Sequence, residues 1–175
     1  MYLKFLARDG VLIAVALFVW WLVAERSLGI GMVADFSGFV AGVLLGVSAF
    51  VLHEWGHVIG GFVGPSILHA NYDLHSPFSF SFDTRRNGLA QFVIMSLGGF
   101  AVTAAIVIGF YLWLPAGLLA TRVACGAAMF LAFLGVVLEL PLFVFAIASG
   151  NVPSAAAVKV EKRGPENSNG AETHL

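Results

Sequence analysis

The sequence has very little cysteine and very little charge. Cys125 is the single cysteine, which excludes an internal disulfide and a cysteine-rich metal site, and we interpret it as a small packed residue. Charged residues make up only 11% of the 175 residues and the formal net charge is -1, so no basic field points to nucleic acid. Hydrophobic residues make up 59%, too many for a soluble globule of this size. The expected solvent is therefore the lipid bilayer.

Long apolar stretches predict about four transmembrane helices. They run from about residue 5 to 24, from near 36 to the Gly64-Pro65 pair, from 89 to 114 and from 123 to 148. The first is not followed by a clear small-residue cleavage site, so we interpret it as a retained helix and not as a signal peptide. The polar stretch 150–175 is poor in aromatic residues and is interpreted as a flexible tail behind a membrane domain, residues 1–149.

The segment between the second and third apolar stretches has a different pattern. Residues 76–82 alternate polar and aromatic side chains with period two, which predicts a strand, and residues 67–72 could pair with it as a hairpin. Unpaired backbone is not tolerated in lipid, so the hairpin is expected at the interface or against protein. The predicted fold class is an all-α polytopic membrane protein with a short β-hairpin-like loop between the second and third helices.

The positive charges predict the orientation in the membrane. Four spans place both termini and the hairpin on one side, and that side carries most of the lysine and arginine. The positive-inside rule therefore predicts cytoplasmic amino and carboxyl termini. The side opposite the termini carries only Arg26 and Arg122. The side with the termini and the hairpin carries Lys4, Arg8, Arg85, Arg86, Lys159, Lys162 and Arg163.

The second apolar stretch contains the motif His53-Glu54-Trp55-Gly56-His57, an H-E-x-x-H pattern. On a helix, histidines at i and i+4 point the same way and can reach one metal ion. Glu54 would act as the base that accepts a proton from an activated water and passes it to the leaving amine. Three ionisable groups in hydrocarbon are costly, so we interpret them as a functional site.

Catalytic zinc typically has three protein ligands, so a further residue is needed beside His53 and His57. Glu139 is the candidate because it is the only formal charge within the fourth stretch and lies about sixteen residues into it, as His53 lies about seventeen into its own. Glu139 could instead be a protonated acid or pair with another polar group. Loop residues that could approach the metal or simply be solvated are His69, His75, Asp73 and Asp83.

Small residues accompany the motif on its helix. Gly38, Gly42 and Gly46 repeat every four residues, which permits close approach of another helix. Extended by helical steps, this stripe reaches His53 and His57. The glycines could serve helix packing alone, or packing and assembly of the site could use the same face.

With these features the chain resembles the site-2 protease family of intramembrane zinc metalloproteases. The resemblance rests on the motif within a membrane helix, on the aromatic segment that follows it, and on the small-residue stretch 96–100 in the next helix. It implies that His53 and His57 bind Zn²⁺, that Glu54 is the catalytic glutamate, and that the site opens toward the cytoplasm. It also implies that an extended membrane protein or peptide substrate adds as a strand along Phe78, Phe80 and Phe82.

The chain also departs from the family pattern, in which an aspartate of a Leu-Asp-Gly motif is the usual third ligand. Here the corresponding place holds Glu139 in Leu-Glu-Leu-Pro, and there is no separate peptide-binding domain. The expected function is a zinc endopeptidase that cuts membrane-embedded or membrane-adjacent segments. The alternative is a catalytically inactive protein that binds metal and a transmembrane partner. A haem-bearing subunit is a third interpretation, which would leave Glu54 without a purpose.

Overall fold

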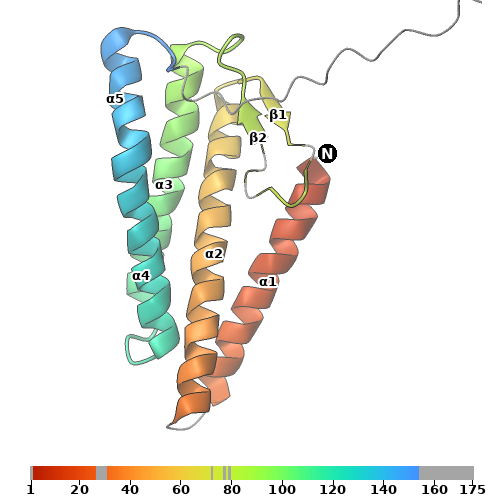
Figure 1. Cartoon of the computed structure of the whole chain (residues 1–175), viewed down its shortest axis with the longest axis vertical. Helices are drawn as coiled ribbons and strands as arrows, with labels where there is room; N and C mark the ends of the chain where they lie inside the picture. Colours follow the sequence, from red (N-terminus) through yellow and green to blue (C-terminus); the bar gives the residue numbers. More distant parts are fainter. Residues whose placement is uncertain (1, 27–30, 72, 77, 79, 154–175) are drawn as a thin grey trace, which may run out of the picture.

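The computed structural model describes residues 2–26, 31–71, 73–76, 78 and 80–153. Its elements are α1 (Tyr2–Arg26), α2 (Met32–Val63), β1 (Leu68–Ala70), β2 (Phe80–Phe82), α3 (Leu89–Trp113), α4 (Leu119–Leu134), the π-helical turn η1 (Gly135–Glu139) and α5 (Leu140–Ser149) (Figure 1). The predicted tail lies outside the described residues from position 154 onward.

Four helical stretches are long and apolar enough to cross a membrane. They are Tyr2–Glu25, Met32–Val63, Leu89–Trp113 and Leu119–Ser149, the last made of α4, η1 and α5. The predicted fold class is confirmed: the protein is an all-α, multi-pass membrane protein with one small hairpin between the second and third spans. The first, second and fourth spans begin three to four residues earlier than expected, so Arg122 lies in the first turn of α4 and not in a loop.

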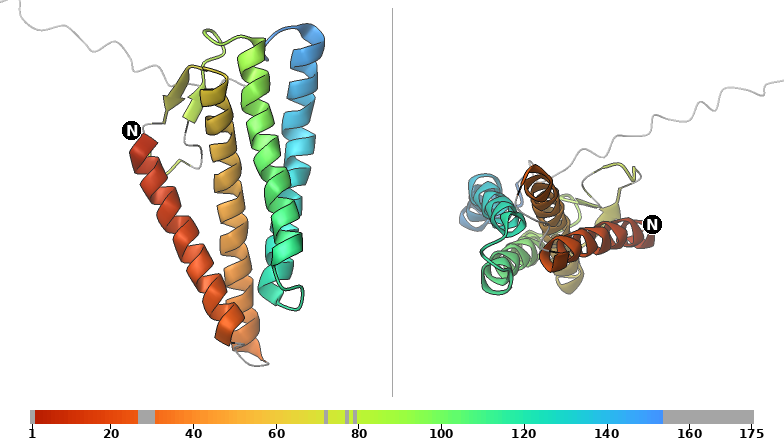
Figure 2. Two further views of the ribbon diagram at one scale, coloured as in Figure 1. Left: turned by 180° about the vertical axis from the view of Figure 1, so that it is seen from behind. Right: turned by 90° about the horizontal axis from the view of Figure 1, so that it is seen from below.

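The motif helix α2 is the centre of the bundle. It packs against α1, α3 and α4, and Figure 2 shows the spans side by side in two views. The amino terminus, the hairpin and the end of α5 lie at one end of the bundle, as expected for an even number of spans (Figure 1). A buried cluster of Phe82, Phe92, Met95 and Ala146 fixes the hairpin to α3 and α5 at that end.

Glycines bring α2 into backbone contact with its neighbours. A Cβ atom at Gly98 of α3 would collide with the carbonyl oxygen of Gly56 and the backbone of Gly60. A Cβ at Gly42 would lie 2.5 Å from Val123 Cβ, and one at Gly46 would lie 2.5 Å from Ala127 Cβ, both on α4. The glycine stripe thus packs against the fourth span, and this close approach brings opposite side chains within hydrogen-bond reach.

The fourth span is not a regular α-helix along its whole length. At η1 the backbone widens to a π-helical turn, in which the Leu140 N–H donates to the Gly135 carbonyl five residues earlier. Pro141 follows directly; it has no N–H and its ring clashes with the carbonyl four residues before it, so an α-helical bond cannot form there. The extra residue of the π-turn changes the direction in which the Glu139 side chain leaves the helix.

The hairpin is shorter than predicted. Antiparallel pairing joins Leu68 to Phe82 and Ala70 to Phe80, so each strand has three residues and Phe78 lies outside β2. The buried side chain of Asn87 closes the base: its amide oxygen accepts from the Ile67 N–H (2.7 Å) and its amide nitrogen donates to the Ile67 carbonyl (2.8 Å). The backbone at the base of the hairpin is therefore satisfied by protein, which permits a non-helical segment at the membrane.

Candidate metal centre

Three ligand-type side chains from two spans converge at one point. His53 Nε2 lies 3.1 Å from Glu139 Oε1, and His57 Nε2 lies 3.4 Å from Glu139 Oε2. The two Nε2 atoms are 3.2 Å apart. The expected match in depth between His53 and Glu139 is thus a direct contact, and the three residues form a group that could hold a metal ion.

Both imidazole rings are oriented from behind by α3. His57 Nδ1 lies 3.1 Å from the carbonyl oxygen of Met95. His53 Nδ1 lies 2.7 Å from Thr103 Oγ1 and 3.2 Å from the Gly99 carbonyl oxygen. A carbonyl oxygen can only accept, so each Nδ1 carries the proton and donates. Such bonds from the distal nitrogen are the usual means by which proteins hold metal-binding histidines in place.

The donor set is suited to a cation. With both protons on Nδ1, neutral rings direct two Nε2 lone pairs at each other and at a carboxylate, and only a positive charge relieves that arrangement. Glu139 Oε2 is buried and has no hydrogen-bond partner among the described residues. Separations of 3.1 to 3.4 Å resemble the edge, about 3.4 Å, of a tetrahedron whose centre binds its ligands at about 2.1 Å.

Gly99 makes room for one of the rings. A Cβ atom at this position would collide with three atoms of the His57 imidazole. Beside it, the Phe100 ring contacts Phe143 of α5 edge to face, at 5.6 Å between centroids. The small-residue stretch 96–100 therefore admits the ring and fixes α3 against the span that carries Glu139.

Glu54 borders a cavity that reaches two of these three residues, His57 and Glu139. The cavity measures about 230 Å³, and Glu54, although 8% exposed overall, contributes to its wall together with His57 and Glu139. Phe78, Phe80 and Phe82 line it from the hairpin, so the three predicted substrate-binding aromatics share one face despite the short strand. The remaining lining residues are Ser81, Phe92, Met95, Ser96 and Leu142. Glu54, two of the three ligand-type residues and a partly polar space therefore meet in one place.

The loop candidates for metal binding have other partners. His69 Nε2 donates to Asp83 at 3.2 Å and His75 Nδ1 to Asp73 at 3.2 Å, and neither histidine belongs to the three-residue group. The hydrogen bond from His69 holds the pKa of Asp83 below its usual value. Hydrogen bonds from the His75 backbone and side chain likewise lower the pKa of Asp73. The interpretation of these residues as surface groups fits this geometry.

Sequence reasoning missed several residues that support the site. Thr103 is a polar residue in an otherwise apolar span, and that polarity is the signal by which it could have been found. From the sequence, Arg8 is a topology signal only and Asp9 has no predicted role, although both lie within the expected first span. They lie inside α1, where Arg8 Nε donates to Asp9 Oδ1 (2.7 Å), and the Trp55 indole N–H of the motif donates to the other Asp9 oxygen (2.8 Å).

No protein-family model, no curated protein and no solved structure matches the chain.

Proposed function

We propose that this protein is an intramembrane zinc endopeptidase, similar to the site-2 proteases, that hydrolyses peptide bonds in membrane-embedded or membrane-adjacent segments. The observation that carries the proposal is the convergence of His53, His57 and Glu139 beside a cavity bordered by Glu54. Two imidazoles and a carboxylate are a ligand set of catalytic zinc, which keeps a further position free. Glu139 would take the place of the aspartate of that family, and it ends the π-turn η1, which sets the direction from which its carboxylate approaches.

The roles of the chain's own residues follow from their positions. When bound, Zn²⁺ supplies Lewis acidity that polarises a carbonyl and lowers the pKa of water. Glu54 takes up a proton from water and delivers it to the leaving amine, which needs a carboxylate at the cavity wall and not among the ligands. Thr103 and the α3 carbonyls keep both imidazoles in the tautomer that presents Nε2.

The hairpin supplies a surface for the substrate. In the described ranges, β2 pairs with β1 along one edge, and its aromatic side chains line the cavity. An extended peptide added to the other edge would bring its backbone alongside the cavity, and extended backbone exposes its carbonyl groups. A helical substrate segment would therefore have to unwind before cleavage.

The depth of the site supports access from the hairpin end. His53 precedes the end of α2 by ten residues and Glu139 precedes the end of α5 by ten, which places both about 15 Å inside the bundle. The hairpin end carries Lys4, Arg85 and Arg86 among the described residues. The positive-inside rule makes this the cytoplasmic end, so the site would open to the cytoplasm.

The test uses the full chain purified into lipid nanodiscs, with zinc content measured by mass spectrometry and cleavage followed with fluorescein-labelled β-casein. We expect Glu54→Gln to keep bound zinc and to lower cleavage by at least about a hundredfold, because proton transfer by a positioned base typically contributes that much. The matched control is Glu25→Gln, an exposed glutamate near the end of α1.

The same measurements separate the two main interpretations. Zinc that is present in the wild type and lost in His53→Ala, together with Glu54-dependent cleavage, supports the protease. Zinc without Glu54-dependent cleavage favours the inactive protein that binds metal and a transmembrane partner. If His53→Ala and the exposed-histidine control His75→Ala hold as much zinc as the wild type, the metal centre itself is refuted.

A further inference from the structure

Asp9 is a buried charge that the proposed metal chemistry does not use. It lies on α1, inside a membrane-spanning helix, and is 2% exposed. A carboxylate in this environment is costly unless it is paired and hydrogen-bonded. Both of its oxygens are satisfied, one by Arg8 Nε and the other by the indole of Trp55. Because Trp55 is the central residue of the H-E-x-x-H motif, this contact joins α1 to the helix that carries the metal ligands.

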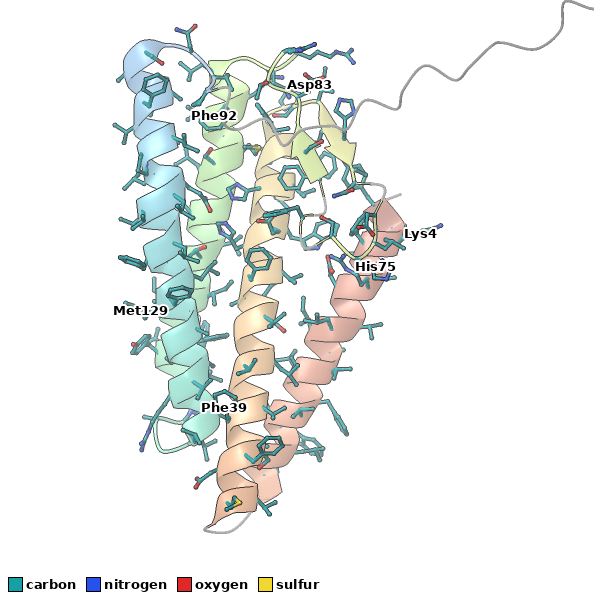
Figure 3. The ribbon with its side chains drawn as sticks, in the orientation of Figure 1. Lys4, Phe39, His75, Asp83, Phe92 and Met129 are labelled. Carbon is teal, nitrogen blue, oxygen red and sulfur yellow. The ribbon has the colours of Figure 1, made fainter. Side chains whose placement is uncertain are left out.

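The guanidinium of Arg8 extends the connection to the hairpin loop. Its NH1 group lies 2.7 Å from the Leu74 carbonyl oxygen and 2.9 Å from that of Ser76. Figure 3 shows His75, which lies between these two residues, beside the first turns of α1 close to Lys4. One side chain thus binds Asp9 by one edge and two loop carbonyls by another, an arrangement that needs the planar fork of arginine.

A second contact attaches the same hairpin to α1. The Tyr2 hydroxyl donates to the Leu68 carbonyl in β1 at 3.0 Å, and the Tyr2 ring packs edge to face on Phe62 of α2. Phe78, two residues after Ser76, packs edge to face on Phe50 of α2, with 6.4 Å between ring centroids. The described residues 73–76 are therefore held by α1 and Phe78 by α2, and Phe78 lies at the cavity wall.

We propose that Arg8, Asp9 and Trp55 form a clamp that positions residues 73–76, and with them Phe78, at the cavity beside Glu54, and so sets how readily a peptide substrate is admitted. The three residues act through the loop and do not touch the reacting atoms, so they are positioning residues. The part of this inference that concerns substrate rests on the proposed proteolytic function; the part that concerns the loop does not.

The clamp can be tested with substitutions that keep the positive charge at position 8 but remove the planar geometry of the guanidinium. Arg8→Lys keeps a positive charge beside Asp9, so the buried carboxylate is not left without a counterion. A lysine ammonium has no rigid fork and cannot hold Asp9 and both loop carbonyls in the same way. Asp9→Asn keeps an oxygen that can accept from Trp55 but removes the charge that orients the guanidinium. The matched control is Arg122→Lys, at an exposed arginine at the opposite end of the bundle.

The first measurement is hydrogen–deuterium exchange of the full chain in nanodiscs, followed at the amides of residues 73–76. Their hydrogen bonds are local, for example from the Ser76 N–H to the Asp73 carbonyl at 3.2 Å, so exchange reports opening of the loop. We expect exchange at least about tenfold faster in Arg8→Lys and in Asp9→Asn, the factor that accompanies loss of one charge-assisted hydrogen bond. Exchange in α2 and the zinc content should stay as in the wild type. Unchanged loop exchange in both variants overturns the clamp.

The second measurement is cleavage of labelled β-casein by the same proteins. We expect Arg8→Lys to raise KM several-fold and to leave kcat within about twofold, because the ligands and Glu54 are not displaced. A lowered kcat with unchanged KM overturns the assignment to substrate admission. If Glu54→Gln cleaves as well as the wild type, the proposed function fails, whereas loop exchange still decides whether the clamp exists.

Discussion

Thr103 offers a sharp test of the metal centre, because its hydroxyl can be removed without changing the shape of the side chain. Its Oγ1 lies 2.7 Å from His53 Nδ1 in a buried position. Thr103→Val replaces the hydroxyl by a methyl group of similar volume and leaves the Gly99 carbonyl, at 3.2 Å, as the remaining partner of the ring. The imidazole therefore keeps its tautomer but loses the shorter of its two bonds.

The magnitude follows from this partial compensation. Removal of an outer-sphere partner of a metal-binding histidine typically lowers metal affinity by about 10- to 100-fold. Because one acceptor remains for Nδ1, we expect the lower end, about tenfold or about 1.4 kcal/mol. Thr103→Ser keeps a hydroxyl and should recover most of the loss.

The assay is a competition titration of zinc between the purified protein in nanodiscs and a chromophoric chelator at fixed pH. The matched control is Thr121→Val, since Thr121 is also buried in a span but its hydroxyl has no hydrogen-bond partner in the described part of the chain. It should bind zinc as the wild type does. Equal zinc affinity in the Thr103→Val variant and the wild type, or an equal loss in the control, would refute the proposed role of this hydrogen bond.

Three further predictions address the ligand, the packing and the hairpin. Glu139→Gln should lower zinc occupancy in the same titration, because an amide oxygen carries no charge to bind the ion, and full occupancy would show that it is not a ligand. Gly98→Ala should destabilise the bundle by about 1–3 kcal/mol in a denaturation experiment, since its Cβ meets backbone of α2, whereas Gly126→Ala, with nothing within 4 Å, should not. The lowered pKa of Asp83 means that its stabilisation of the hairpin base is present above its unfolded pKa and is lost as pH falls through the lower folded value. A carboxyl-carbon NMR titration should show the Asp83 midpoint shift upward in His69→Ala, and an unchanged midpoint would contradict the hydrogen bond.

For Glu139, the height in the bundle could be predicted from the sequence but the direction of the side chain could not. Depth and charge selected it correctly as the residue that meets His53, because residue counts along two antiparallel spans fix height with little dependence on packing. The count could not give the direction of the side chain. That direction depends on the π-turn next to Pro141. Proline has no N–H to donate, so the regular α-helical hydrogen-bond pattern is interrupted there.

The residues of the H-E-x-x-H motif could be predicted from the sequence, whereas the residues that hydrogen-bond to them could not. The histidines were recognisable because their spacing is local and periodic, so a helix alone places them together. Thr103, Gly99 and Met95 accept hydrogen bonds from the histidines but belong to another helix. Two of these acceptors are backbone carbonyl oxygens, which every residue type has, so the sequence cannot identify them. Asp9 and Trp55 are 46 residues apart, and only the packing of α1 on α2 makes them partners.

By itself, the sequence determined that the chain lies in a membrane, that it crosses about four times, and that one helix carries two histidines and a glutamate in order. These properties follow from length, hydropathy and local spacing, which are summed along the chain. The tertiary structure decided the direction in which Glu139 leaves its span, which groups hold the histidine rings and how α1 is tied to the hairpin. Those relations depend on helix–helix distances set by glycine contacts and on the register of one helix against another, which no local pattern specifies.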